Sequence, residues 1–216
     1  MTMDILAHRG WWLTANEKNS VEAFIRAWKA GYGLETDVRD TGGQLVISHD
    51  IPTGDELTFD AFLKLYNDHG AGTMLALNIK SDGLTKAITV ALEKHNISRY
   101  FVFDMSIPDS LHYIRAGMTA FGRRSEYEEA SVLDADVSGI WWDCFTGRDD
   151  DAQFSMALAS GKAAAIVSPE LHGRPYKDIW ARWKESLKED DIMPMVCTDF
   201  PEEFERFFVD KDARRL

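Results

Sequence analysis

The chain has 216 residues, of which 45% are hydrophobic and 12% aromatic, enough for one substantial core. Its 24 basic and 36 acidic residues give a formal charge of −12, which excludes a general binder of nucleic acid or anionic membranes. The apolar runs are too short to span a bilayer, MTMDIL lacks the pattern of a secretory signal, and two cysteines are too few for a disulfide framework. We therefore expect one domain over residues 1–216, without stable membrane association, in the reducing cytoplasm.

Strand-like runs alternate with helix-period stripes along the whole chain. The first strand is expected over residues 4–10, followed by a helix over 20–31 that Ser20 is placed to cap. A strand over 33–39 leads through a Gly-Gly turn into a short returning strand that ends at Asp50. Further strands are expected at 73–80, 99–106, 118–125, 138–145, 163–171 and 192–200, further helices at 58–70, 84–96, 108–117, 150–161, 177–190 and 201–213, and a short helical or irregular piece at 126–134.

This order makes eight strand–helix units, the number that an α/β protein of the (β/α)₈ TIM-barrel class requires. An open doubly wound sheet is the alternative, but no Gly-rich phosphate turn follows the first strand. In such barrels the catalytic groups lie at the C-terminal ends of the strands. Polar residues at or near the predicted strand ends are His8, Glu35, Asp37, His49, Asn78, Lys80, Asp104, Arg123, Asp143, Glu170 and Asp199.

The densest group of these residues falls within the first fifty positions. Glu35 and Asp37 are two apart on a predicted strand, so their carboxylates share one face, and a divalent cation is the usual remedy for their repulsion. His8 and His49 could flank such a cation as acid and base. Arg9 adds a fixed charge suited to a phosphate. This combination predicts metal-assisted phosphodiester chemistry.

Several ordered motifs then resemble the glycerophosphodiester phosphodiesterases, a TIM-barrel family. They are AHRG, EKNSVEAFIRAWKAG, ETDV, SHD and, near the C-terminus, TDFP. The resemblance is strong over residues 4–50, recurs at 74–80 and 192–201, and is weak between them. It implies a phosphodiesterase that acts on a small-molecule phosphodiester and uses Ca²⁺ or Mg²⁺. It also implies site roles: catalysis for His8 and His49, metal binding for Glu35 and Asp37, and phosphate contact for Arg9.

The resemblance is incomplete on the third barrel strand, where typical members carry a glutamate in an E-x-K arrangement. This chain has Asn78 and Lys80 in that place. We expect Lys80 to contact phosphate and the Asn78 amide to be a third metal ligand, although the site loses one negative charge. Glu170 could supply the missing anionic ligand or grip a substrate hydroxyl.

A second departure lies between Asp50 and Met74, where typical members have an insertion that covers the glycerol end of the substrate. This chain has a short loop and one helix there. Such a trimmed barrel is also similar to phospholipase D toxins of the sphingomyelinase D type. The substrate's head group, the metal ion, the oligomeric state and the histidine that acts as base therefore stay open.

Each of these assignments has a simpler alternative. Glu35 and Asp37 could form an exposed strand face or a salt-bridge pair, Lys80 could be an ordinary strand-end lysine, and Asn78 could be a turn residue. The alternative to an enzyme is a barrel that binds a phosphodiester or a metal but turns over poorly, and Asn78 motivates that hypothesis. We favour the enzyme, since both histidines and both carboxylates are intact.

Overall fold

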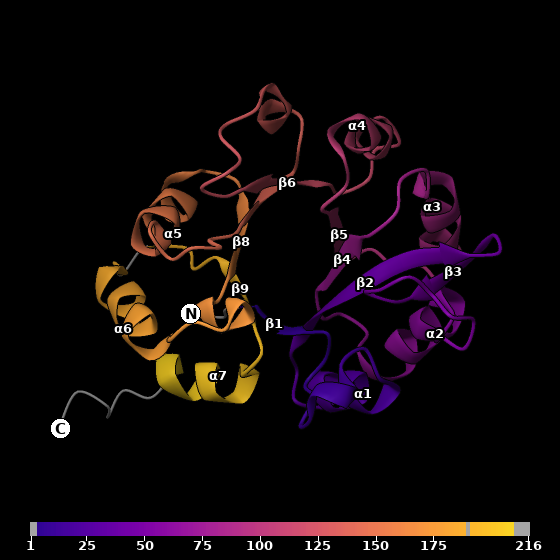
Figure 1. The fold of residues 1–216 in the computed structure, drawn as a ribbon, viewed down its shortest axis with the longest axis horizontal. Coiled ribbons are helices and arrows are strands. Elements are labelled where there is room, and N and C mark those ends of the chain that lie inside the picture. Colours follow the sequence, from indigo (N-terminus) through magenta and orange to yellow (C-terminus); the bar gives the residue numbers. More distant parts are fainter. Residues whose placement is uncertain (1–3, 189–190, 210–216) are drawn as a thin grey trace.

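Parallel strands and flanking helices form a closed (β/α)₈ barrel in the computed structural model, which describes residues 4–188 and 191–209 (Figure 1). Among these residues the barrel strands are β1 (Ile5–His8), β2 (Gly33–Thr41), β4 (Leu75–Ile79), β5 (Tyr100–Phe103), β6 (Phe121–Arg124), β7 (Gly139–Trp142), β8 (Ala163–Val167) and β9 (Met195–Thr198). The α-helices in the same residues are α1 (Val21–Lys29), α2 (Phe59–His69), α3 (Thr85–Lys94), α4 (Ile107–Arg115), α5 (Asp150–Ala159), α6 (Lys177–Ser186) and α7 (Pro201–Val209). The predicted TIM-barrel fold is thus confirmed.

The strands follow the order β5-β4-β2-β1-β9-β8-β7-β6 around the barrel. The last gap is closed between β5 and β6, where Val102 N donates to Thr119 O at 2.9 Å and Val102 pairs with Ala120 in a parallel bridge. This closure excludes the open doubly wound sheet. The short strand β3 (Gln44–Ile47) pairs antiparallel with β2 as a hairpin outside the barrel path, as the Gly-Gly turn predicts.

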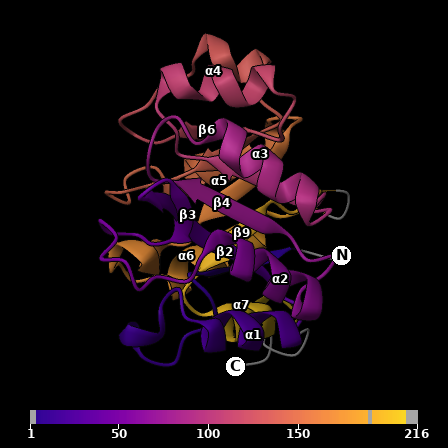
Figure 2. The same cartoon turned by 90° about the vertical axis from the view of Figure 1, so that its right-hand side faces the viewer.

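Local sequence signals account for the helices that surround this barrel. The side chain of Ser20 accepts a hydrogen bond from Ala23 N at 3.2 Å, and the side chain of Thr58 accepts one from Ala61 N at the same distance, so each caps its helix. The fifth unit has only a 3₁₀ turn, η2 (Val132–Ala135), which agrees with the short or irregular piece expected there. Figure 2 shows α2 and α3 outside the strands β2 and β4.

Several strands end earlier than predicted, whereas β2 continues to Thr41, two residues past its predicted end. Asp104, Asp143 and Asp199 therefore lie in loops just beyond β5, β7 and β9. The predicted helix over 177–190 ends at Ser186. Residues 189–190 of that helix, and residues 210–213 of the predicted C-terminal helix, lie outside the described residues.

Apolar side chains fill the inside of the barrel and thereby fix which strand residues face its axis. They are Leu6, Ala76, Phe101, Phe103, Phe121, Trp141, Ala165, Val167 and Cys197. Residues two positions further on each strand continue the same inward face, since side chains alternate along a strand. The polar residues at the C-terminal mouth that follow this pattern are His8, Asn78, Arg123, Asp143 and Asp199.

Cys144 and Cys197 are both buried and free. None of the helices in the described parts of the chain combines the length and the apolar character needed to cross a bilayer.

Candidate active site

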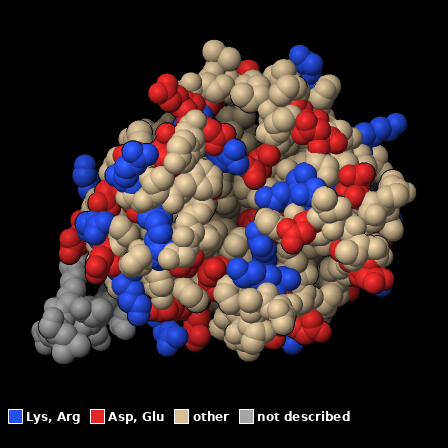
Figure 3. All heavy atoms as spheres, viewed as in Figure 1, with Lys and Arg blue, Asp and Glu red and all other residues tan. Residues whose placement is uncertain are grey.

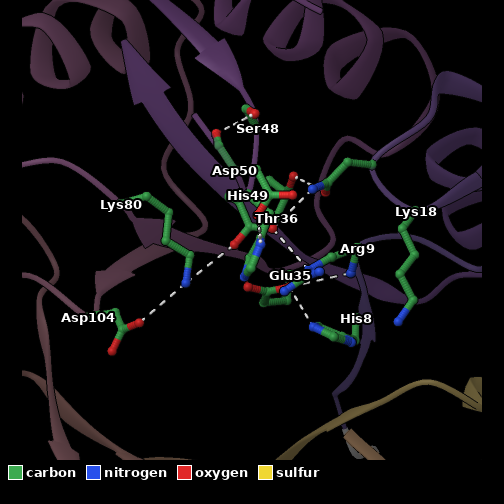
Figure 4. A network of polar contacts seen from close by, with 12 residues as sticks. His8, Arg9, Lys18, Glu35, Thr36, Ser48, His49, Asp50, Lys80 and Asp104 are labelled. Atoms are coloured by element: carbon green, nitrogen blue, oxygen red, sulfur yellow. Dashed lines mark hydrogen bonds and ion pairs between the residues drawn. The ribbon is translucent and has the colours of Figure 1, made fainter. Parts of the chain in front are cut away.

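His8 ends β1 and lies between the carboxylates of Asp199 and Glu35, and Figure 4 shows its contact with Glu35. Its Nδ1 lies 2.6 Å from Oδ1 of Asp199, and its Nε2 lies 3.9 Å from Oε2 of Glu35. Because a carboxylate can only accept, Nδ1 carries the proton and donates to Asp199. Burial lowers the pKa of His8 below its usual value, although Asp199 opposes that shift. The imidazole is therefore neutral near pH 7, with the lone pair of Nε2 free at the mouth.

The turn after His8 explains the HRG motif in physical terms. Arg9 has a positive φ of 55°, and its N–H donates to Glu35 O at 2.9 Å. Gly10 has a φ of 90°, and a Cβ there would lie 2.7 Å from the Cβ of Ala23 on α1. Only glycine fits at that position, and the turn that it permits brings the Arg9 guanidinium to the end of β2.

Glu35 and Asp37 both lie in β2 and are almost fully buried. Glu35 is paired in register with His8 of β1, and Asp37 with Asn78 of β4, so four polar residues share the top of three adjacent strands. Burial first, and then the negative charge of Asp37, raise the pKa of Glu35 to about 8, against the charges of Arg9 and Lys80. The alternative of an exposed strand face is therefore excluded for this pair.

Asp37 is the centre of the network. Its Oδ2 lies 3.0 Å from Nε of Arg9 and accepts a hydrogen bond of 3.0 Å from Nδ2 of Asn19. Its Oδ1 lies 3.5 Å from Nζ of Lys80, which is equally far from Oδ2 of Asp104 (Figure 4). Two positively charged side chains therefore contact one buried carboxylate. Such salt bridges are the alternative to metal binding that the sequence left open for Asp37.

The oxygens around Asp37 also fit a hard divalent cation. Oδ1 of Asp37 and Oδ1 of Asn78 are buried and accept no hydrogen bond within the described residues. With the carboxylate of Glu35 they form an all-oxygen donor set, which suits Ca²⁺ or Mg²⁺. No group of three His, Cys, Asp or Glu side chains that could hold a metal occurs in the described parts of the chain, so the Asn78 amide would have to complete the set.

His49 lies on the rim rather than in the buried network. Its side chain is 43% exposed, and its Nδ1 lies 2.8 Å from Oδ1 of Asp50. The loop that carries it is fixed over the end of β2, because Ser48 N donates to Asp37 O at 3.0 Å. In the view of Figure 4, His49 lies above Glu35 and His8 lies below it.

Glu170 is placed apart from the carboxylate pair, in the 3₁₀ turn η3 (Pro169–His172) after β8. Its buried carboxylate accepts hydrogen bonds from the hydroxyls of Ser168 and Thr198 and from Asp199 N, the last at 3.2 Å. Trp180 Nε1 in turn donates to Oγ of Ser168 at 2.7 Å. Glu170 therefore reaches His8 only through Asp199, and its own oxygens are engaged with neighbouring protein groups.

Two site residues carry roles that sequence reasoning did not assign. The sequence predicted Asp199 only as a strand-end residue within the TDFP motif, and its hydrogen bond to His8 was not predicted. Asn19 was not singled out, yet its side chain binds Asp37 and accepts from Thr36 Oγ1 at 2.9 Å. Its place inside the EKNS motif was the available signal.

The surface around the mouth has an uneven charge distribution. Figure 3 shows a face that is hollowed at its centre, with basic side chains gathered beside the hollow on the side where Figure 1 shows β2 and β4. Lys80 directly follows β4, and Arg9 lies in the turn after β1, the strand next to β2. A negatively charged substrate therefore meets local positive charge despite the chain's net charge of −12.

Several solved structures share this fold. A glycerophosphodiester phosphodiesterase from Parabacteroides distasonis matches with a TM-score of 0.75 and 16% identity, over 96% of this chain and 97% of that one. A phosphodiesterase from Oleispira antarctica, solved with the product sn-glycerol-3-phosphate, matches at 0.72 and 16%, over 96% and 97%. A Ca²⁺-dependent phosphatidylinositol-specific phospholipase C from Streptomyces antibioticus matches at 0.58 and 11%, over 95% and 96%.

Comparisons at the level of sequence gave no match, either to a family model or to a curated protein. At identities of 11–16% the structural likeness establishes the fold. The fold so established is the (β/α)₈ barrel, and the chain spans nearly the whole length of the structures that it matches.

Proposed function

We propose that this chain is a phosphodiesterase that hydrolyses a glycerophosphodiester-like or other small or lipid-derived phosphodiester with the help of a divalent cation. The observation that carries the proposal is the convergence of His8, Glu35, Asp37, Arg9 and Lys80 at the C-terminal mouth of the barrel. The fold shared with phosphodiesterases supports it. The two buried free thiols are consistent with a reducing compartment, and we propose the cytoplasm.

We assign each side chain a role that its position supports. Arg9 and Lys80 bind non-bridging oxygens of the phosphate, exchanging part of their contact with Asp37 for contact with the substrate. His8 accepts the proton of the nucleophile on Nε2, because Asp199 already holds the proton on Nδ1. His49 on the exposed rim protonates the leaving alkoxide. The nucleophile is water or a neighbouring hydroxyl of the substrate itself.

Glu35, Asp37 and Asn78 would hold the Ca²⁺ or Mg²⁺ ion. When bound, the ion offsets the negative charge that develops on the phosphate oxygens. The protein's own contribution there is to keep two carboxylates and an amide oxygen dry and close together, on strands whose register fixes their spacing.

We assign Glu170 a positioning role and, in this proposal, no direct contact with substrate. Its carboxylate fixes the backbone N–H of Asp199 and the hydroxyl of Thr198, and Asp199 in turn orients His8. A histidine held in one orientation and one tautomer is a more effective base than a freely rotating one.

A second candidate function is a barrel that binds phosphodiesters with little turnover. Two observations favour it: an amide stands at Asn78 where a carboxylate would bind the ion more strongly, and Arg9 and Lys80 already neutralise Asp37. The experiment that separates the two is hydrolysis of bis(p-nitrophenyl) phosphate and a panel of glycerophosphodiesters with Ca²⁺, Mg²⁺ or Mn²⁺. Cation-dependent turnover that disappears in His8→Ala supports the enzyme, whereas tight binding of the diesters without turnover supports the second candidate.

A further inference from the structure

One half of the barrel mouth is not used by the proposed phosphate site. In the strand order β7 stands opposite β2, and β6 opposite β1. Arg123 of β6 and Asp143 after β7 continue the inward faces that Phe121 and Trp141 occupy inside the barrel. The interior of an eight-stranded barrel is only wide enough for side chains or one small ligand. This half therefore lies across the barrel mouth from a phosphodiester bound by Arg9.

Asp143 and His172 form a second carboxylate–imidazole pair on that side. Nε2 of His172 lies 2.6 Å from Oδ1 of Asp143, the same separation as in the pair of His8 and Asp199. Within the described residues, Oδ2 of Asp143 and Nδ1 of His172 take part in no hydrogen bond. The pair is mostly buried yet accessible, with 22% of the His172 side chain exposed. The pair therefore presents a carboxylate oxygen of Asp143 and an imidazole nitrogen of His172 to a ligand at the barrel mouth.

Aromatic side chains line the outer side of this pair. The rings of Phe145 and His172 have centroids 4.9 Å apart, and Tyr127 lies 6.1 Å from Phe145. Phe145 and Tyr127 are 39% and 69% exposed, so both rings leave apolar surface open to a ligand. Phe145 is held in place, since its N–H donates to Oε2 of Glu126 at 3.0 Å. We define Asp143, His172, Phe145 and Tyr127 as the alcohol-side cluster.

The charges around the cluster favour a neutral ligand over an ammonium group. Asp143 is paired with His172, while Asp104 and Glu128 are both paired with Arg123. Glu126 accepts from the backbone N–H groups of Phe145 and Thr146. These four carboxylates thus each have a protein partner, which weakens their attraction for a cationic head group.

We propose that the alcohol-side cluster binds the leaving alcohol of the substrate, and that this alcohol is a neutral polyol or sugar. Hydroxyl groups would donate to Oδ2 of Asp143 and pair with Nδ1 of His172, while the C–H face of the ring or chain lies on Phe145. This inference rests on the proposed phosphodiesterase function, and it adds the class of head group to it.

The test compares two diesters that share the glycerophosphate and differ in the alcohol: glycerophosphoinositol and glycerophosphocholine. The wild type is expected to have the higher kcat/KM for the inositol diester. In His172→Ala and Phe145→Ala the ratio of the two kcat/KM values is expected to fall by about 10-fold or more, because a site built to bind hydroxyls loses that selectivity. The matched control is His95→Ala, which removes a histidine paired with Asp60 at 2.8 Å away from the mouth and leaves the ratio unchanged.

Wild-type preference for the choline diester, or ratios unchanged in both variants, would overturn the inference. The proposed function is tested separately by bis(p-nitrophenyl) phosphate, whose alcohols carry no further hydroxyl. If no diester is turned over, the proposed function fails, and the inference is decided by calorimetry with myo-inositol 1-phosphate and phosphocholine. Tighter binding of the inositol phosphate that weakens in His172→Ala supports the cluster as a polyol site, and equal binding of the two probes contradicts it.

Discussion

His8 and Asp199 are 191 residues apart in the chain, yet Nδ1 of the histidine lies 2.6 Å from Oδ1 of the aspartate. The contact exists because β1 and β9 are neighbours in the closed barrel, with Ala7 in register with Thr198. The pairing of the first and last barrel strands is therefore what orients a strand-end histidine as a base. This pair also links the proposed chemistry to Glu170, which binds the Asp199 backbone.

Replacing Asp199 by Asn tests that orientation. Asp199 raises the pKa of His8 against the lowering by burial, so its removal is expected to move the acidic limb of the pH profile of kcat/KM to lower pH. The rate is also expected to fall by about 10-fold or more, since the tautomer is no longer fixed. Asp60→Asn, which breaks the exposed pair with His95, is the matched control. An unchanged pH profile in Asp199→Asn would show that the pair has no part in the reaction.

Glu170 is expected to act through Asp199 alone. Glu170→Gln keeps the volume but weakens the bonds to Thr198 and Asp199 N, so kcat should fall while KM for a generic diester changes little. The pH profile should shift in the same direction as in Asp199→Asn. A large rise in KM with unchanged kcat would instead return Glu170 to the role of a substrate-binding residue.

The buried Glu35 predicts how stability depends on pH in the absence of a divalent cation. Its pKa of about 8 in the folded protein lies above the unfolded value of 4.5, so its stabilising contribution is complete below pH 4.5 and is lost as pH rises through 8. The melting temperature should therefore fall over this range, by about 2–4 °C for each kcal/mol lost. Glu35→Gln should reduce this dependence and should melt above the wild type at pH 9. Thermal melts in chelator that show the same pH slope for both proteins would contradict this account.

Asn78 tests the proposed cation site most sharply. Asn78→Glu adds a third carboxylate on a strand already in register with Asp37, so calorimetry should show tighter Ca²⁺ or Mg²⁺ binding, and half-maximal activity should need less cation. If Asn78 only packs, affinity stays unchanged and stability falls. Unchanged affinity in Asn78→Glu could also mean that Glu170 already supplies the third carboxylate. The double variant Asn78→Glu with Glu170→Ala separates these two explanations.

Much of this architecture could be predicted from the sequence, because its signals are local. The alternation of strand and helix patterns, the cap at Ser20 and the glycine turn at Gly42 each depend on a few neighbouring residues. The grouping of Glu35 with Asp37 follows from strand periodicity alone. These features need no knowledge of how distant segments meet.

The features that could not be predicted depend on tertiary contacts. Nothing local signals that Asp199 binds His8, that Arg9 and Lys80 both reach Asp37, or that Glu170 turns its carboxylate toward Thr198. The exposure of His49 also depends on how the hairpin of β2 and β3 is placed over the barrel. Sequence patterns identify these residues as strand ends and leave their partners undetermined.

The central claim is that His8 and His49 transfer protons during hydrolysis. Kinetics of His8→Ala and His49→Ala on a confirmed diester substrate, with saturating cation, test this claim most directly. Each substitution is expected to lower kcat by about 10²–10⁴-fold, because each removes a proton-transfer group, while circular dichroism and melting stay close to those of the wild type. The loss in His8→Ala should exceed that in Asp199→Asn, which keeps the imidazole. A near-wild-type kcat in either histidine variant would remove that histidine from the mechanism and contradict the account.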